Sequence, residues 1–290
     1  MTLLVISPDY MSHYNPLSIL ARAGSAAGHR VVVATGPGLR SQVEAEEFEW
    51  RHLQLGPASN TGVSTVDRAM ADFLAATEAG PLATIAYQAE QRRRDLLWEP
   101  EAAVARIGEL LDELDPEHTI VDHVSFGSTL ALHASGRPFV TLVPGHPSQL
   151  PVGSERYGVP AAWPRSIRVD PTELAEIEHL VDATTEAFTE RWNRALLGSG
   201  STRPPVADAF RITGDRVLFN SVAALADPSR RSQLPADHHF VGPLVRQEDL
   251  PDAHRSWADD DGGGPRVYVA LGTFLSHRGD VLARIAEGLR

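Results

Sequence analysis

Three histidines and one aspartate stand where predicted β-strands end. His13 follows the first apolar run of the chain, Asp122 and His123 come at the end of a central run, and His146 follows the next run. In an open parallel sheet, ligands bind beyond the carboxyl ends of the strands, so these side chains converge on the edge where chemistry takes place. An imidazole held by a carboxylate can act as a general base, and a hydroxyl group is a suitable proton donor for that base.

Two interpretations of His13 and Asp122 are open from their spacing. In the first, the two residues follow neighbouring strands, and the carboxylate orients the imidazole for proton abstraction. In the second, His13 caps or packs against the first helix, and Asp122 accepts backbone N–H groups of the helix that follows it. Polar residues at strand ends are common in any α/β protein, so spacing alone does not separate the two.

The elements that position these residues form a doubly wound parallel α/β sheet in our interpretation. Residues 3–6 are a short apolar strand, Pro16 opens a helix in its first turn, and Gly28 ends that helix. The β-branched run 30–35 is a second strand. A helix between two fully apolar strands predicts a parallel βαβ unit that is buried on both faces.

The same alternation returns further along the chain. Two stretches rich in Gly, Pro and Ser, 56–65 and 148–165, are longer than usual connections and are candidate ligand-binding loops. Further strands are expected at 119–122, 139–143, 217–220 and 239–242, and further helices at about 67–97, 101–114, 126–135 and 171–197.

A polar, glycine-rich stretch at 246–264 predicts a linker between two domains. Residues 1–245 form the first domain, and 265–290 are the beginning of a second, incomplete domain or a segment that packs onto the first, because one strand and one helix cannot make a core. Its expected elements are a strand at 266–271, a turn at Gly272 and Thr273, and a helix at 279–289.

Composition excludes several classes of function. The 290 residues contain no cysteine, so disulfides, thiolate metal sites and cysteine nucleophiles are ruled out. All 26 cationic residues are arginines, which excludes Schiff-base catalysis and a P-loop lysine. The formal charge of −12 argues against nucleic-acid and anionic-membrane partners. No apolar run is long enough to span a bilayer and the N-terminus has no basic signal region, so we expect a soluble, cytoplasmic protein.

Three other site types find no support in the motifs. A Gly-x-Gly-x-x-Gly fingerprint does not follow the first strand, which removes the main sign of a dinucleotide site. His123 stands two residues before Ser125, where a nucleophile elbow requires glycine. His238 and His239 are adjacent in a predicted strand and point to opposite faces, so they do not jointly bind a metal ion.

Five short motifs occur in order along nearly the whole chain. They are Ser-His13-Tyr-Asn-Pro-Leu after the first strand, Gly28-His-Arg-Val-Val-Val-Ala-Thr, Ile120-Val-Asp122, Val241-Gly-Pro-Leu, and Val267-Tyr-Val-Ala-Leu-Gly-Thr273. Together they resemble the GT-B glycosyltransferases of family 1, the bacterial enzymes that glycosylate natural products. The resemblance implies that residues 1–245 are the Rossmann-like, acceptor-binding N-terminal domain of that fold.

The resemblance also implies a reaction and roles for two residues. A sugar would pass from a nucleotide diphosphate donor of UDP or dTDP type to a hydroxyl of a hydrophobic small molecule, with inversion and with no metal or cofactor. His13 would be the general base and Asp122 the residue that orients it. The family usually has glycine before this histidine, where Ser12 stands here. Four aromatic residues are candidates for lining the acceptor pocket, or alternatively core residues: Phe73, Tyr87, Trp98 and Phe126.

The donor side is nearly absent from the sequence. Family members bind the nucleotide sugar mainly through a second domain, and only Gly272 and Thr273 match its positions, as a loop near phosphate or as a plain turn. The chain alone is therefore expected to be inactive. The alternative is a non-catalytic acceptor-binding or auxiliary protein that lacks the donor domain. A gene that continues for a further ~120 to 150 residues, the size of one domain, favours the enzyme.

Overall fold

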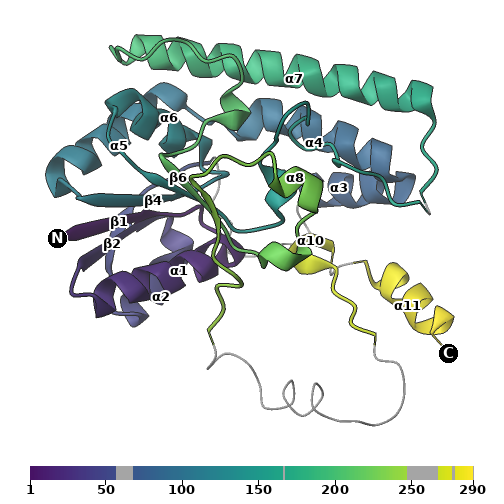
Figure 1. The fold of residues 1–290 in the computed structure, drawn as a ribbon, viewed down its shortest axis with the longest axis horizontal. Helices are drawn as coiled ribbons and strands as arrows, with labels where there is room; N and C mark the ends of the chain where they lie inside the picture. The colour runs from purple at the N-terminus through teal and green to yellow at the C-terminus, as the bar shows by residue number, and fades with distance from the viewer. Residues whose placement is uncertain (57–67, 166, 247–266, 276–277, 290) are drawn as a thin grey trace, which may run out of the picture.

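The computed structural model describes residues 1–56, 68–165, 167–246, 267–275 and 278–289. At its centre lies a seven-stranded sheet of order β3-β2-β1-β4-β5-β6-β7, in which all neighbouring strands are parallel (Figure 1). The strands are β1 (Thr2–Ile6), β2 (Arg30–Thr35), β3 (Glu49–His52), β4 (His118–Asp122), β5 (Val140–Val143), β6 (Arg216–Phe219) and β7 (His238–Phe240). The predicted doubly wound α/β sheet is confirmed.

Helices cover both faces of this sheet. Figure 1 shows α1 and α2 on one face and α5 and α6 on the other. The helices are α1 (Met11–Ala26), α2 (Arg40–Ala45), α3 (Arg68–Ala79), α4 (Pro81–Asp95), α5 (Pro100–Leu114), α6 (Phe126–Ser135), α7 (Pro171–Gly198), α8 (Pro228–Arg231), α10 (Gly272–Leu275) and α11 (Gly279–Gly288). Short 3-10 turns are η1 (Pro37–Leu39), η2 (Pro147–Gln149), η3 (Ala209–Arg211) and η4 (Ala223–Leu225).

Strand β1 shows why its sequence is apolar throughout. Leu4 and Ile6 pack into the core on the side of α5 and α6, while Leu3 and Val5 pack with residues of α1 on the opposite side. Successive side chains of a strand point to opposite faces, so a strand with helices on both sides needs an apolar residue at every position. The same reasoning applies to Arg30–Thr35, whose last five residues are all buried.

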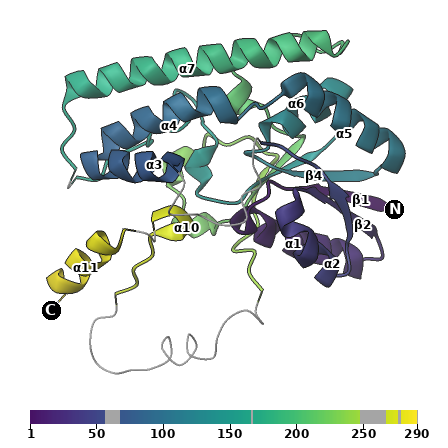
Figure 2. The same cartoon turned by 180° about the vertical axis from the view of Figure 1, so that it is seen from behind.

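A third group of helices lies beyond α6. Figure 2 shows α3 and α4 beneath the long helix α7. Phe188 and Trp192 of α7 are buried with Phe126 of α6 and Phe210 of η3. Helix α7 begins at Asp170, whose carboxylate accepts the backbone N–H groups of Thr172 and Glu173, a favourable N-terminal cap.

Four expectations about the elements are corrected. The first helix begins at Met11, so Pro16 lies inside it and not in its first turn. The stretch 67–97 is two helices, α3 and α4, because Gly80, with φ of 121°, interrupts it before Pro81. Strand β3 and helix α2 are additional to the predicted elements.

The fourth correction concerns the segment after the predicted linker. The predicted strand at 266–271 is wrong for residues 267–271, which have no regular secondary structure. Their side chains are exposed or half-buried, and no strand in the described part of the chain pairs with them, so the apolar run has no ladder to join. The predicted turn at Gly272 is the start of α10, and the helix expected at 279–289 is α11.

Most of the predicted linker, 246–264, lies outside the described residues, so the division into two domains stays a prediction. Within the described ranges, no helix is both long enough and apolar enough to cross a membrane.

Candidate active site

His13 lies in the first turn of α1, not in the loop before it. The helix follows β1 directly, and β1 is flanked by β2 and β4 in the middle of the sheet. The backbone N–H of His13 donates to the carbonyl of Tyr10, 3.0 Å away, which closes the first turn. Because α1 starts at the carboxyl end of a central strand, its first turn stands at the edge where ligands bind in such sheets.

Asp122 is the last residue of β4, the neighbour of β1. Its carboxylate Oδ2 is 2.9 Å from Nδ1 of His13, and its Oδ1 accepts the backbone N–H of Val124 at 2.9 Å. The Asp122 side chain is fully buried, whereas 21% of the His13 side chain is exposed. One carboxylate oxygen thus supports the turn before α6 and the other meets the imidazole, and the role of the two residues in a reaction stays a prediction.

The surroundings of this pair make the imidazole of His13 a stronger base than an ordinary histidine side chain. Burial lowers the pKa of His13, but the negative charge of Asp122 and the hydrogen bond to it outweigh burial and raise the pKa above 6.5. A carboxylate only accepts hydrogen bonds, so Nδ1 of His13 donates to Asp122. In the neutral ring this leaves the lone pair on Nε2.

His123 is next to the pair but has different surroundings. Its Nε2 donates to the backbone carbonyl of Gln149 in η2 at 3.1 Å, because a carbonyl can only accept. Its Nδ1 is buried without a hydrogen-bond partner among the described residues. Burial lowers the pKa of His123 to about 4, so the ring is neutral near pH 7. We interpret His123 as a support between β4 and the loop after β5.

His146 is exposed and belongs to that same loop. Its Nδ1 accepts from the backbone N–H of Ser148 and lies 2.8 Å from the hydroxyl of Ser148, so it caps η2. All three histidines predicted to gather at the carboxyl edge follow strands there. Of these three histidines, His13 is the one that hydrogen-bonds a carboxylate among the described residues.

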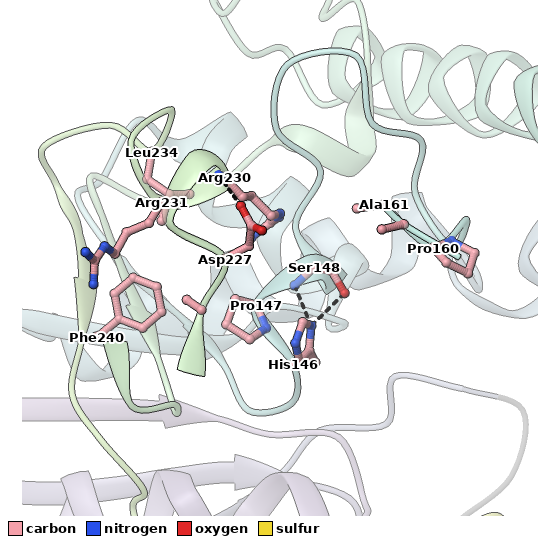
Figure 3. A pocket seen from close by; sticks show the side chains of 12 residues that line it. His146, Pro147, Ser148, Pro160, Ala161, Asp227, Arg230, Arg231, Leu234 and Phe240 are labelled. Carbon is pink, nitrogen blue, oxygen red and sulfur yellow. Dashed lines mark hydrogen bonds between the residues drawn. The ribbon is translucent and has the colours of Figure 1, made fainter. Parts of the chain in front are cut away.

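A pocket opens beyond the ends of β5 and β6 and beside β7 (Figure 3). It has a volume of about 240 Å³, with Pro147 and Phe240 among its apolar walls. Arg230 at its rim donates to both carboxylate oxygens of Glu155, at 2.9 and 3.1 Å, and to the carbonyl of Leu150. The positive charge of Arg230 is therefore already compensated by the carboxylate of Glu155.

The four aromatic residues that are candidates for lining the acceptor pocket pack against other side chains of the protein. Phe126 is 1% exposed and packs edge-on against Phe210, so it is a core residue. The rings of Phe73 and Tyr87 lie 6.1 Å apart, and the guanidinium of Arg106 lies over the ring of Trp98.

Sequence reasoning missed Tyr157, although the loop 148–165 was a candidate ligand-binding segment. Its ring stacks on Phe210 with a centroid distance of 4.3 Å and lies 6.0 Å from the ring of His123. Only its place in that loop could have drawn notice to it.

Among the described residues, no contact joins Gly272, one of the two expected donor-side positions, to His13 or Asp122. Gly272 is exposed and has φ of 70°, the left-handed region that favours glycine, at the start of α10. The side chain of Thr273 lies outside the described residues. Their donor role stays a prediction.

Comparison with known proteins gives one curated relative. No family model matches the chain. The 4'-demethylrebeccamycin synthase of Lentzea aerocolonigenes is 25% identical over 281 residues, which cover 93% of this chain and 62% of that protein. The chain thus spans less than two thirds of the length of this relative.

Two of the solved structures that the chain matches are glycosyltransferases by name, and the first is similar in fold. The glycotransferase of kitacinnamycin has a TM-score of 0.51 and 15% identity, and the match covers 93% of this chain and 55% of that one. The glycosyltransferase VinC, in complex with DTDP, has a TM-score of 0.49 and 15% identity over 92% of this chain and 58% of that one. By sequence and by fold, the chain is similar to the natural-product glycosyltransferases of the GT-B class.

Proposed function

We propose that this chain supplies the acceptor half of an inverting glycosyltransferase. The observation that supports this most is the 2.9 Å contact between His13 and Asp122 at the carboxyl edge of a doubly wound sheet. The similarity to a curated natural-product synthase over 93% of the chain adds a reaction class to that geometry.

The chemistry follows from the tautomer of His13. As the acceptor oxygen attacks the anomeric carbon, its proton passes to Nε2 of His13, and the bond from that carbon to the nucleotide diphosphate breaks. The ring becomes an imidazolium with protons on both nitrogens. The buried carboxylate of Asp122 stabilises that positive charge. Attack from the side opposite the leaving group inverts the anomeric configuration.

The acceptor in this proposal is a hydrophobic small molecule with a hydroxyl group. The donor is a nucleotide diphosphate sugar of UDP or dTDP type, with Gly272 and Thr273 on its side of the reaction. No step in this scheme assigns a role to a metal ion or a cofactor.

The stereochemistry of transfer tests the proposal. The complete product of the gene is incubated with UDP- and dTDP-sugars of known anomeric configuration and with hydrophobic alcohols and phenols. The anomeric coupling constant of the product is then read by NMR. We expect a product of opposite configuration to the donor. Retention would contradict direct displacement, and acceptor binding without transfer to any donor would favour the non-catalytic alternative.

A further inference from the structure

Arg92 on α4 is a partly buried cation without a carboxylate partner in the part of the chain that the structure describes. Its guanidinium lies over the ring of Tyr157, 5.0 Å from the centroid, and Nη2 donates to the side-chain oxygen of Gln88 at 3.3 Å. Burial lowers the pKa of Arg92, as it does for a cation that is only partly compensated. A buried charge is costly unless another group pairs with it.

The guanidinium is held in one place by its neighbours. Gly158 has φ of 82°, and a Cβ atom built at this glycine would lie 2.1 Å from Nη1 of Arg92. The guanidinium therefore packs against the backbone of Gly158 while one of its faces meets Tyr157. The five N–H donors of an arginine radiate in the plane of the group, and only the bond to Gln88 is made within the described residues.

This cation is next to the candidate active site. Tyr157 is a neighbour of both Arg92 and His123. The guanidinium of Arg92 lies over the ring of Tyr157, and the centroids of the Tyr157 and His123 rings are 6.0 Å apart. Burial raises the pKa of Tyr157 to about 12, with Arg92 lowering it and Asp122 raising it, so its hydroxyl is protonated near pH 7. The guanidinium of Arg92 is thus one aromatic ring away from His123, which follows Asp122 in the chain.

We propose that Arg92 and Tyr157 form a subsite for the carboxylate of an apolar small molecule. The planar fork of a guanidinium matches the two oxygens of a carboxylate. One uncompensated cation balances one negative charge, which suits a carboxylate better than a phosphate. Phe126 and Phe210 are buried core residues that pack against the ring of Tyr157 and hold it in place beneath the guanidinium. That the ligand is the sugar acceptor rests on the proposed function.

A pair of probes of equal shape tests the subsite by calorimetry with residues 1–290. The probes are 1-naphthoate and its neutral counterpart 1-naphthamide. We expect naphthoate to bind about 10- to 100-fold more tightly, the usual effect of hydrogen bonds to a charged group. Arg92→Gln should remove this preference and Arg92→Lys should keep part of it. Arg93→Gln, the same charge change at an exposed neighbour, should leave the preference unchanged.

Four outcomes would overturn the subsite. They are equal affinity for the two probes, an unchanged preference in Arg92→Gln, an equal loss of preference in Arg93→Gln, and no binding of either probe in the millimolar range. Thermal melts check that each variant is folded. If Arg92→Gln unfolds, Gly158→Ala displaces the guanidinium without removing it and should weaken naphthoate alone.

The test separates the subsite from the proposed function because binding needs no sugar transfer. In the complete product of the gene, His13→Ala should lower kcat by roughly 10²- to 10⁴-fold yet keep the preference for naphthoate. A preference for naphthoate together with no sugar transfer by the complete product of the gene would contradict the proposed function and still support the subsite.

Discussion

Asp122 uses its two carboxylate oxygens for different purposes. Oδ1 accepts the backbone N–H of Val124, and Oδ2 meets the imidazole of His13. Asparagine keeps the shape and one accepting oxygen but carries no charge. A change to asparagine therefore tests the charge while it preserves most of the local structure.

The first prediction concerns the pH dependence of Asp122→Asn. A general base works in its neutral form, so kcat/KM should rise with pH through the pKa of His13, which lies above 6.5 in the native protein. Without the Asp122 charge, burial still lowers that pKa, so the acidic limb should move to lower pH and the maximal rate should fall. The measurement is kcat/KM against pH between about 5 and 9. Asp112→Asn, at a side chain that is 85% exposed, is the matched control. An acidic limb that stays in place would contradict the pairing.

The second prediction concerns His123 and stability. Its native pKa of about 4 lies below the ordinary 6.5, so between these values the unfolded chain binds more protons at this residue than the native chain. This residue should therefore reduce the free energy of unfolding as pH falls from 6.5 to 4, by at most about 3 kcal/mol.

Urea unfolding across this pH range measures the effect. His123→Gln keeps a donor for the Gln149 carbonyl and cannot titrate, so it should lose this part of the pH dependence. His146→Gln is the control, because His146 is exposed. Equal pH dependence in the native protein and in His123→Gln would contradict a neutral buried imidazole.

The contact between His13 and Asp122 could be predicted at this scale, and the contact between Arg92 and Tyr157 could not. His13 and Asp122 follow apolar runs that pair as neighbouring strands, so their proximity depends on topology that the alternation of elements already indicates. Arg92 meets Tyr157 only because α4 packs beside the loop 148–165. No periodicity in either segment indicates that contact.

At the scale of elements, central strands are easier to predict than edge strands. Strands β1 and β2 are buried on both faces and are nearly continuous apolar runs. Strand β3, Glu49–His52, pairs only with β2 and is charged and partly exposed, so it has no apolar run to find. Helix α1 begins five residues before Pro16, within a polar stretch whose helical start has no side-chain cap to mark it.

A buried ion pair connects Arg246, at the start of the predicted linker, with residues beside α1. Glu46, at the end of α2, pairs with Arg246 and accepts from the hydroxyl of Tyr14 at 3.1 Å. Arg246 also donates to Ser18 of α1 at 2.8 Å. The side chains of Glu46 and Arg246 are only 3% and 13% exposed. The helix that bears His13 is thus linked to the first residue of the predicted linker.

The third prediction follows from this pair. Arg246→Met should leave the Glu46 carboxylate buried with the more distant Arg22, 3.6 Å away, as the one cation paired with it among the described residues. We expect the free energy of unfolding to fall by about 2 to 4 kcal/mol. Adding Glu46→Gln should cost less than the sum of the single changes. Arg40→Met, which breaks an exposed pair with Glu44, is the control and should cost less than about 1 kcal/mol. Equal effects at Arg246 and Arg40 would contradict a stabilising buried network.

At the scale of the whole molecule, the features with chemical meaning lie at one edge of the sheet. His13 and Asp122 stand at the ends of the central strands, and the pocket of Figure 3 lies beyond the ends of β5 and β6 and beside β7. In a doubly wound parallel sheet the carboxyl ends of all strands point to the same side, so the fold itself explains why these features gather there. The chain spans 62% of the length of the curated relative that it matches.

The most direct test of the central claim is the turnover of His13→Ala in the complete product of the gene. A general base contributes roughly 10²- to 10⁴-fold to the rate, so we expect kcat to fall by that factor. Thermal melting should change little, because the His13 side chain is partly exposed and its main contact is Asp122. The double variant with Asp122→Asn should lose much less than the product of the two single effects. Near-full activity in His13→Ala, or a loss that follows unfolding alone, would contradict the account.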